Sequence, residues 1–353
     1  MPNEKQMDER TLGSWRVRAC AAGLCVGAQV FLSGCAVGMP LALTGAWLAA
    51  IPSLLFAAWL CARCRRVLDG GLQGRAYWVL VALTLLGCSA FAATSLVGFA
   101  ANTLVVQANH AWTEILALAA AALCALSGGI GTPRLSFAMR YALPVLVLGL
   151  SLAAAPVRVP AGLFPILGAG AAKVGVASLA MLFGAAPVLM LTLPPPELAQ
   201  RRAQDDGACV PQTQFFLVRV LAGAGLGAAL LFLTCACTTY EVIAKSGEWS
   251  ARLSMTAGGA RHEGVRQMLL MTAKLMAMLL LAANMLCAAE QALVLAFPAL
   301  RRRRAGLAIL VLLLGLSLAL RVLQGDVPVL SSAPAIGAAA LLLGIFAGRG
   351  RRI

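Results

Sequence analysis

Side chains able to do chemistry are few in this chain and far apart. Cys61 and Cys64 form a C-x-x-C pair, the spacing at which two thiolates can bind one Zn²⁺. No second cysteine or histidine pair follows at a ligand spacing, and the two histidines, His110 and His262, fall in predicted external loops. The sequence also lacks phosphate-binding, nucleophile-elbow and HExxH motifs. We therefore expect no enzyme activity, no catalytic residues, no metal and no cofactor.

The composition indicates which kind of solvent surrounds the chain. Of the 353 residues, 61% are hydrophobic and 12% are charged, against about 45–50% and about 25% in a soluble domain. One core of this size cannot bury such an excess, so the surrounding solvent must be a lipid bilayer. The formal charge of +15 is spread in short clusters between apolar runs, which indicates membrane topology and not nucleic-acid binding.

Ten apolar stretches are long enough to span a bilayer at about 20 residues each. They begin near residues 19, 46, 77, 111, 135, 171, 215, 267, 305 and 328. The fourth (111–127) and fifth (135–155) are short or flanked by polar residues, so nine or eleven helices are alternatives. With both termini cytoplasmic, 19 Lys and Arg lie inside and six lie outside, as the positive-inside rule requires.

The domain organisation follows from these helices. We expect a cytoplasmic segment at 1–18, a ten-helix domain at 19–348 and a basic cytoplasmic tail at 349–353. Within the domain, one repeat covers about 19–155 and the second about 171–348.

Glycine and proline clusters interrupt the first and sixth predicted helices, at Gly34–Pro40 and Gly184–Pro187. Five-plus-five inverted repeats place discontinuous helices at these two corresponding positions, with substrate between them. Chance is the alternative, because glycine and proline are frequent in membrane helices. We predict an all-α integral membrane protein of ten transmembrane helices, a five-plus-five inverted repeat with discontinuous helices 1 and 6. The predicted substrate-binding residues are Gly34, Cys35, Ala36, Gly38, Phe183, Gly184 and Ala185.

Two ionisable residues, Lys274 and Glu290, lie within the predicted eighth helix. Such a residue is costly in a bilayer unless it is paired or hydrated, so each is a functional candidate. A separation of about 24 Å along the helix prevents a direct pair. For Lys274 the alternative is an ammonium that extends to the external interface.

Four stretches together resemble the spore germination permease family, the membrane-embedded B subunits of nutrient germinant receptors in the amino acid-polyamine-organocation superfamily. They are Gly38-Met39-Pro40 with Gly45-Ala46-Trp47-Leu48, Gly128–Arg134, Gly162–Gly170 with its Pro-x-Leu-x-x-Gly element, and Gly258–Glu263 with its Arg-x-Glu element. The resemblance makes Pro165, Arg261, Glu263 and Lys274 structural or coupling candidates. One departure is that family members often carry a glutamate after the glycine of helix 6, where this chain has Ala185 and Ala186.

The resemblance implies a B subunit in the bacterial cell membrane or spore inner membrane that binds a small nutrient such as an amino acid and triggers germination. Its implied partners are a receptor A subunit and a lipoprotein C subunit, with membrane lipids around it and no nucleic acid. The same fold allows a proton- or sodium-coupled amino-acid transporter. A third hypothesis is a structural subunit whose ligand site has decayed, because small apolar residues replace polar ones at the helix-6 break.

Overall fold

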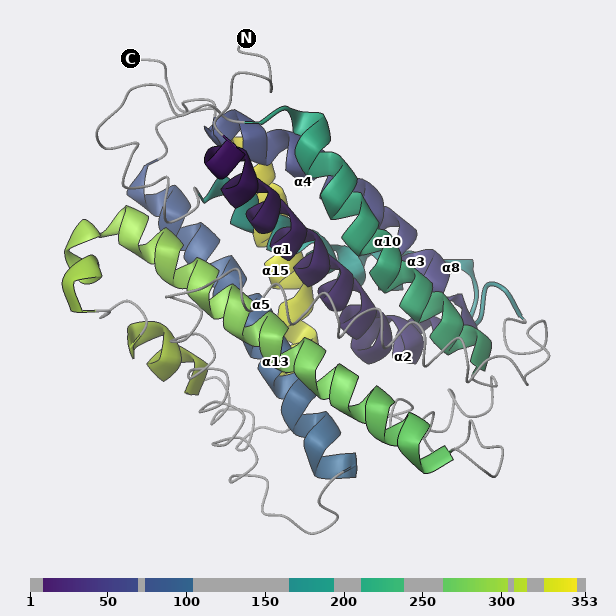
Figure 1. Cartoon of the computed structure of the whole chain (residues 1–353). Coiled ribbons are helices and arrows are strands. Elements are labelled where there is room, and N and C mark those ends of the chain that lie inside the picture. Colours follow the sequence, from purple (N-terminus) through teal and green to yellow (C-terminus); the bar gives the residue numbers. More distant parts are fainter. Residues whose placement is uncertain are drawn as a thin grey trace.

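The computed structural model describes residues 9–68, 74–103, 165–193, 211–237, 263–303, 308–315 and 327–347. All elements within these ranges are helical (Figure 1). The main ones are α1 (Glu9–Ser33), α4 (Ile51–Leu68), α5 (Arg75–Thr103), α8 (Ala171–Met181), α10 (Thr213–Cys237), α13 (Glu263–Ala296) and α15 (Val327–Phe346). The predicted fourth and fifth membrane helices lie outside the described residues.

Five described helices are long and apolar enough to cross a membrane. They are Leu12–Ala49, Arg75–Leu96, Ala171–Thr192, Thr213–Ala236 and Thr272–Ala296. They correspond to the predicted first, third, sixth, seventh and eighth helices. α4 ends in three arginines within its last two turns, and α15 contains a shorter apolar helix at Ala335–Phe346. Membrane-spanning helices therefore account for most of the described chain.

Helix packing repeats when the two halves of the chain are exchanged. α1 packs on α10, and α4 packs on η4 (Leu182–Thr192), the 3-10 helix that continues α8. In membrane-helix numbers these are the pairs one–seven and two–six, which a pseudo-two-fold axis would interchange. The pairs that such an axis maps onto themselves are also in contact: α1 with η4, α4 with α10, and α5 with α13. This is the pattern of a five-plus-five inverted repeat.

The contacts also divide the helices into two groups. Four helices form a closed ring in the order α1, α10, α4 and η4, each packed on the next. α5 and α13 pack extensively on each other, and this pair touches the ring through α1 and η4 (Figure 1). We refer to these groups as the ring and the pair.

Close approach of α1 and α10 depends on two glycines from each helix. Gly23 and Gly27 face Gly223 and Gly227, and a Cβ on Gly27 would meet the carbonyl oxygen of Gly223. Glycines four residues apart on both helices let the two backbones touch. Because lipid provides no hydrophobic effect between helices, close packing of this kind is what stabilises their association. Gly225, on the outward face of α10, has open space beside it. The close contact is therefore confined to the face inside the ring.

Both predicted interruptions change the type of helix. α1 passes into a π-helical turn, η2 (Gly34–Gly38), and then into the short α2 (Met39–Ala42). α8 passes at Leu182 into η4, which contains Pro187. A π turn widens the helix and a 3-10 segment tightens it, so both alter which backbone groups are paired. The discontinuities of helices 1 and 6 thus exist as altered hydrogen bonding, with the chain still coiled.

Candidate functional site

Glycines in the π turn bring neighbouring helices close. A Cβ on Gly34 would press on the side chain of Leu231 in α10, and one on Gly38 would lie 2.7 Å from the Met181 sulfur at the end of α8. Gly34, Cys35 and Gly38 are buried, and Ala36 is half-buried. The four predicted residues of helix 1 therefore lie at the junction of both halves of the chain.

The predicted residues of helix 6 are buried against this same part of helix 1. A Cβ on Gly184 would lie 3.2 Å from Cγ2 of Val30 and 3.3 Å from Oγ of Ser33, the residue that precedes the π turn. Phe183 and Ala185 are also buried, and the Phe183 ring meets the Phe91 ring of α5 edge-on at 4.9 Å. The structure thus brings the two altered helices together.

Side chains of α4 satisfy backbone carbonyls in and beside η4. Ser53 Oγ donates a hydrogen bond to the Met181 carbonyl (2.8 Å), and Cys64 Sγ donates to the Val188 carbonyl (3.7 Å). Cys64 therefore has a structural partner, and Cys61 is buried beside it in α4. Among the described residues, no three His, Cys, Asp or Glu side chains gather in a group that could hold a metal ion.

The Pro165–Gly170 turn, part of the stretch that resembles the permease family, packs on the corner between helices 1 and 2. Gly168 has a positive φ of 53° and lies against the Ala42 carbonyl, where any Cβ would clash. Thr44 Oγ1 donates to the Pro165 carbonyl at 2.6 Å. Pro165 therefore belongs to the contact that joins this corner to the start of α8, and its own ring is exposed.

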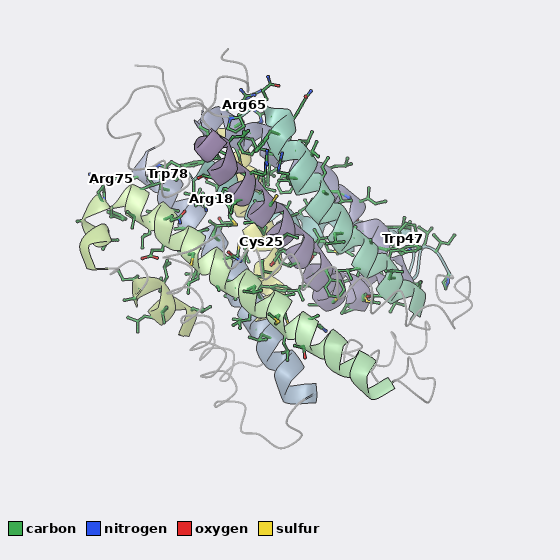
Figure 2. The ribbon with its side chains drawn as sticks, viewed as in Figure 1. Arg18, Cys25, Trp47, Arg65, Arg75 and Trp78 are labelled. Atoms are coloured by element: carbon green, nitrogen blue, oxygen red, sulfur yellow. The ribbon has the colours of Figure 1, made fainter. Side chains whose placement is uncertain are left out.

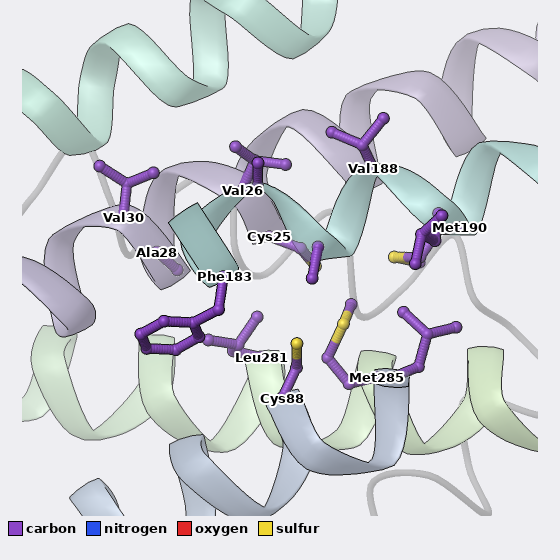
Figure 3. Packing of buried hydrophobic residues seen from close by; sticks show 14 of the residues in the cluster. Cys25, Val26, Ala28, Val30, Cys88, Phe183, Val188, Met190, Leu281 and Met285 are labelled. Atoms are coloured by element: carbon purple, nitrogen blue, oxygen red, sulfur yellow. The ribbon is translucent and has the colours of Figure 1, made fainter. Parts of the chain in front are cut away.

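Sulfur and apolar side chains fill the centre between the ring and the pair. Figure 3 shows Cys25 of α1, Phe183 of η4, Cys88 of α5 and Leu281 of α13 converging there. Ser89 donates its hydroxyl proton to the Ala282 carbonyl at 2.8 Å, which joins α5 to α13. The side chains that meet there are apolar or contain sulfur, apart from two amides.

Those two amides, Gln29 and Asn284, were missed by the sequence analysis because it searched for charges and glycines. Gln29 is fully buried, and neither its Oε1 nor its Nε2 has a hydrogen-bond partner. Asn284 is also fully buried and donates from Nδ2 to the Leu280 carbonyl (2.8 Å), but its Oδ1 has no partner. An amide embedded in a long apolar run was the available signal at both positions.

The relative register of α1 and α13 places the two amides about one helical turn apart in depth. At one end Arg18 of α1 donates to Gln291 of α13, and toward the other end Cys35 interacts electrostatically with Lys274. The two helices are therefore antiparallel, and eleven residues from Arg18 to Gln29 correspond to a level near Leu280. Asn284 then lies about one helical turn, roughly 6 Å, from the level of Gln29.

Lys274 is buried, with 8% of its surface exposed, and faces Cys35 in the π turn. The ammonium group therefore lies at the altered part of helix 1 and does not extend to the external interface. Of the other two coupling candidates, Glu263 is the first residue of α13 and Arg261 lies outside the described residues.

Arginines gather at one end of the helices. Arg18, Arg65 and Arg75 lie toward that end in Figure 2, and Trp47 lies at the opposite end. Arg65 Nη1 donates to Thr213 Oγ1 at 3.1 Å, so the end of α4 is joined to the start of α10 there. This gathering gives the helices a polarity along the membrane normal.

No protein-family model matches the chain, and no curated protein matches it either. Solved structures do. One is Mhp1, a nucleobase-cation-symport-1 family transporter in a closed conformation with bromovinylhydantoin bound (16% identity over 96% of this chain and 79% of that one, TM-score 0.56). Two mutants of the manganese transporter of Eremococcus coleocola match at 13% and 12% identity, covering 98% of this chain and 79% of theirs (TM-scores 0.57 and 0.59). The chain therefore has the all-helical, inverted-repeat fold of these membrane transporters.

Proposed function

We propose that this protein is a secondary transporter of a small organic solute. The observation that carries the proposal is the contact between the 3-10 segment of helix 6 and the last turn of α1 before the π turn, where a Cβ on Gly184 would meet Val30 and Ser33. In inverted-repeat transporters, such altered segments surround the solute near the bilayer midplane. The similar solved structures are transporters, which supports this function over the germinant receptor suggested by the sequence.

The mechanism follows from the two helix groups. The glycine contact between α1 and α10 holds the ring together, whereas α5 and α13 meet it through fewer contacts. Rocking of the pair against the ring would open the centre first to one side of the membrane and then to the other, which is alternating access. Phe183 and Phe91 lie at this boundary, so their edge-on contact must separate during the motion.

The proposal includes the orientation of the helices in the membrane. The end that carries Arg18, Arg65 and Arg75 is assigned to the cytoplasm, because Lys and Arg accumulate on cytoplasmic segments. Both termini are then cytoplasmic, in a multi-pass protein of the bacterial cell membrane.

Uptake by the purified protein in liposomes tests the function. Liposomes carrying an imposed pH or sodium gradient are offered labelled amino acids, nucleobases and hydantoins. We expect saturable uptake of at least one class above that of empty liposomes. Gly184→Leu should abolish it, because the new side chain would press on Val30 and Ser33; the matched control is Gly175→Leu on the same membrane helix, where a Cβ meets open space. Absence of flux for every class and gradient would refute the transporter.

A germinant receptor is the second candidate, and one observation favours it. Of the side chains that the structure describes, Glu290 is the only carboxylate, and it lies near the basic end of α13. Ion-coupled carriers commonly use a carboxylate inside the membrane as a proton relay, so this centre suits a protein that binds a nutrient without moving it. The receptor would act with an A subunit and a lipoprotein C subunit.

The same liposomes separate these candidates. Stabilisation of the protein by an amino acid, without any flux, would support the receptor. Deletion of the gene would then block germination in a spore former. If deletion blocked germination but Gly184→Leu had no effect, a structural subunit with a decayed ligand site would be the better description.

A further inference from the structure

Gln29 and Asn284 are the two amides among the described residues that keep a buried polar atom without a hydrogen-bond partner, as the indole nitrogens of Trp15 and Trp47 and the Tyr77 hydroxyl also do. A buried polar atom without a partner is costly, and folded proteins rarely keep one without a reason. Here three such atoms, Gln29 Oε1, Gln29 Nε2 and Asn284 Oδ1, come from two helices on opposite sides of one boundary. α1 and α13 are in contact across this boundary.

The helix faces agree with this placement. Gln29 lies four residues after Cys25 and four before Ser33, so it shares the face of α1 on which Cys25 meets Cys88. Asn284 lies three residues after Leu281 and three before Cys287. Those two residues face α1, Leu281 in the centre and Cys287 beside Arg18. The unpaired amides therefore occupy the two sides of the centre already assigned to the solute.

We propose that Gln29 and Asn284 are the polar anchors of a binding site for a small neutral molecule with an amide or ureide edge and a second N–H group, such as a hydantoin or a pyrimidine base. A glutamine amide presents one acceptor and one donor side by side, which matches the adjacent N–H and C=O of such an edge with two hydrogen bonds. Asn284 Oδ1 accepts a third hydrogen bond from the ligand. This inference rests on the proposed function and names its substrate class.

Neutrality follows from the surroundings. A zwitterionic amino acid needs a partner for its ammonium group, since an unpaired charge is far more costly in an apolar site than an unpaired dipole. Figure 3 labels the uncharged side chains of Cys25, Cys88, Phe183, Leu281 and Met285 around this centre. The buried Lys274 lies six residues along α13 from the level of Gln29, roughly 9 Å away. Phe183 and Met285 instead suit a flat, polarisable ring.

Thermal-shift titration of the full-length protein in nanodiscs, with hydantoin, uracil, acetamide, L-alanine and acetate, tests the proposal. We expect at least one of hydantoin, uracil and acetamide to raise Tm by several degrees near saturation, and L-alanine and acetate to have no effect. Gln29→Met and Asn284→Leu, which keep size but remove the amide, should each weaken binding at least tenfold. Ser178→Ala on α8 is the matched control, because its half-buried hydroxyl already donates to the carbonyl of Val174 within the same helix.

The ligand-free variants give a second readout. Gln29→Met should keep or raise Tm, by up to about 2–4 °C, because an unpaired buried amide is replaced by a thioether. A structural glutamine would give a large loss of Tm without any ligand. That loss, or ordered water satisfying both amides in the ligand-bound protein, would overturn the proposal.

Uptake distinguishes failure of this inference from failure of the proposed function. Robust uptake of L-alanine with no binding of hydantoin, uracil or acetamide would leave the transporter standing and reject the amide site. Binding of hydantoin without any flux would keep the amide site and reject transport.

Discussion

The guanidinium of Arg18, at the start of the first membrane helix, donates a 2.6 Å hydrogen bond to the side-chain oxygen of Gln291 near the end of the eighth. This bond joins the ring to the pair at the end where the arginines gather. Arg18 is only 3% exposed, so its charge is held between helices and not in solvent. A separation of α1 from α13 at this end must break the bond, which makes it a candidate latch at the end that the proposed orientation places in the cytoplasm.

Arg18→Met should open that end more often. The substitution keeps the apolar stem but removes the bond to Gln291, and loss of about 1 kcal/mol would raise the open population roughly fivefold. Cys287 lies beside Arg18 and is buried, so its labelling by a maleimide, followed site by site with mass spectrometry, should accelerate by that factor. Arg63→Met, which removes an arginine stacked on Trp59 within α4, is the control and should leave the rate unchanged. Equal rates in both variants would exclude the latch.

The glycine contact between α1 and α10 predicts a sharp contrast within one helix. Gly227→Ala places a methyl group against the backbone of Gly27 and forces the helices apart, at a cost of about 1–3 kcal/mol. Gly225→Ala, two residues away on the open face, should be neutral or slightly stabilising because alanine is the better helix former. Thermal denaturation in detergent measures the difference. Similar Tm values for the two variants would show that the contact is not tight.

Much of the fold was predictable from the sequence because the bilayer imposes strong constraints. Helices have to satisfy their own backbone groups in lipid, so apolar runs located α5, α8, α10, α13 and α15 to within four residues of their starts. Matching glycine and proline clusters also predicted which two helices are altered. The form of the alteration, a π turn and a 3-10 segment, was not predictable because it depends on packing against Leu231, Met181 and Val30.

The candidate site was predictable only in part. Glycine marked where helices 1 and 6 meet, since close approach demands small residues. Gln29 and Asn284 escaped because an amide within an apolar run carries no periodic or motif signal, and its importance depends on having no partner in three dimensions. Lys274 was recognised as a candidate, but its placement against Cys35 needed the antiparallel register of α1 and α13.

The backbone conformation of Leu43 predicts that a glycine variant at this position is more stable than an alanine variant. Leu43 follows α2 with φ 52° and ψ −126°, a conformation that glycine adopts readily and a leucine does not. Leu43→Gly should therefore be more stable than Leu43→Ala, by about 1 kcal/mol, although it removes more side chain. The control is Leu41, which is half-buried within the helix, where alanine should be more stable than glycine by a similar amount. If alanine is also preferred at 43, the backbone does not hold this conformation in the membrane.

Lys274 predicts transport that does not need sodium. In inverted-repeat transporters the backbone of an interrupted helix can coordinate a coupling cation. Here a buried ammonium already faces Cys35 in the π turn of helix 1. A second cation at this turn would be repelled by the ammonium, so uptake should be equal when sodium is replaced by choline. Lys274→Met removes the charge and should lower uptake at least tenfold in either medium. Uptake by the unaltered protein that rises more than fivefold with sodium would show that Lys274 does not occupy the place of a coupling ion.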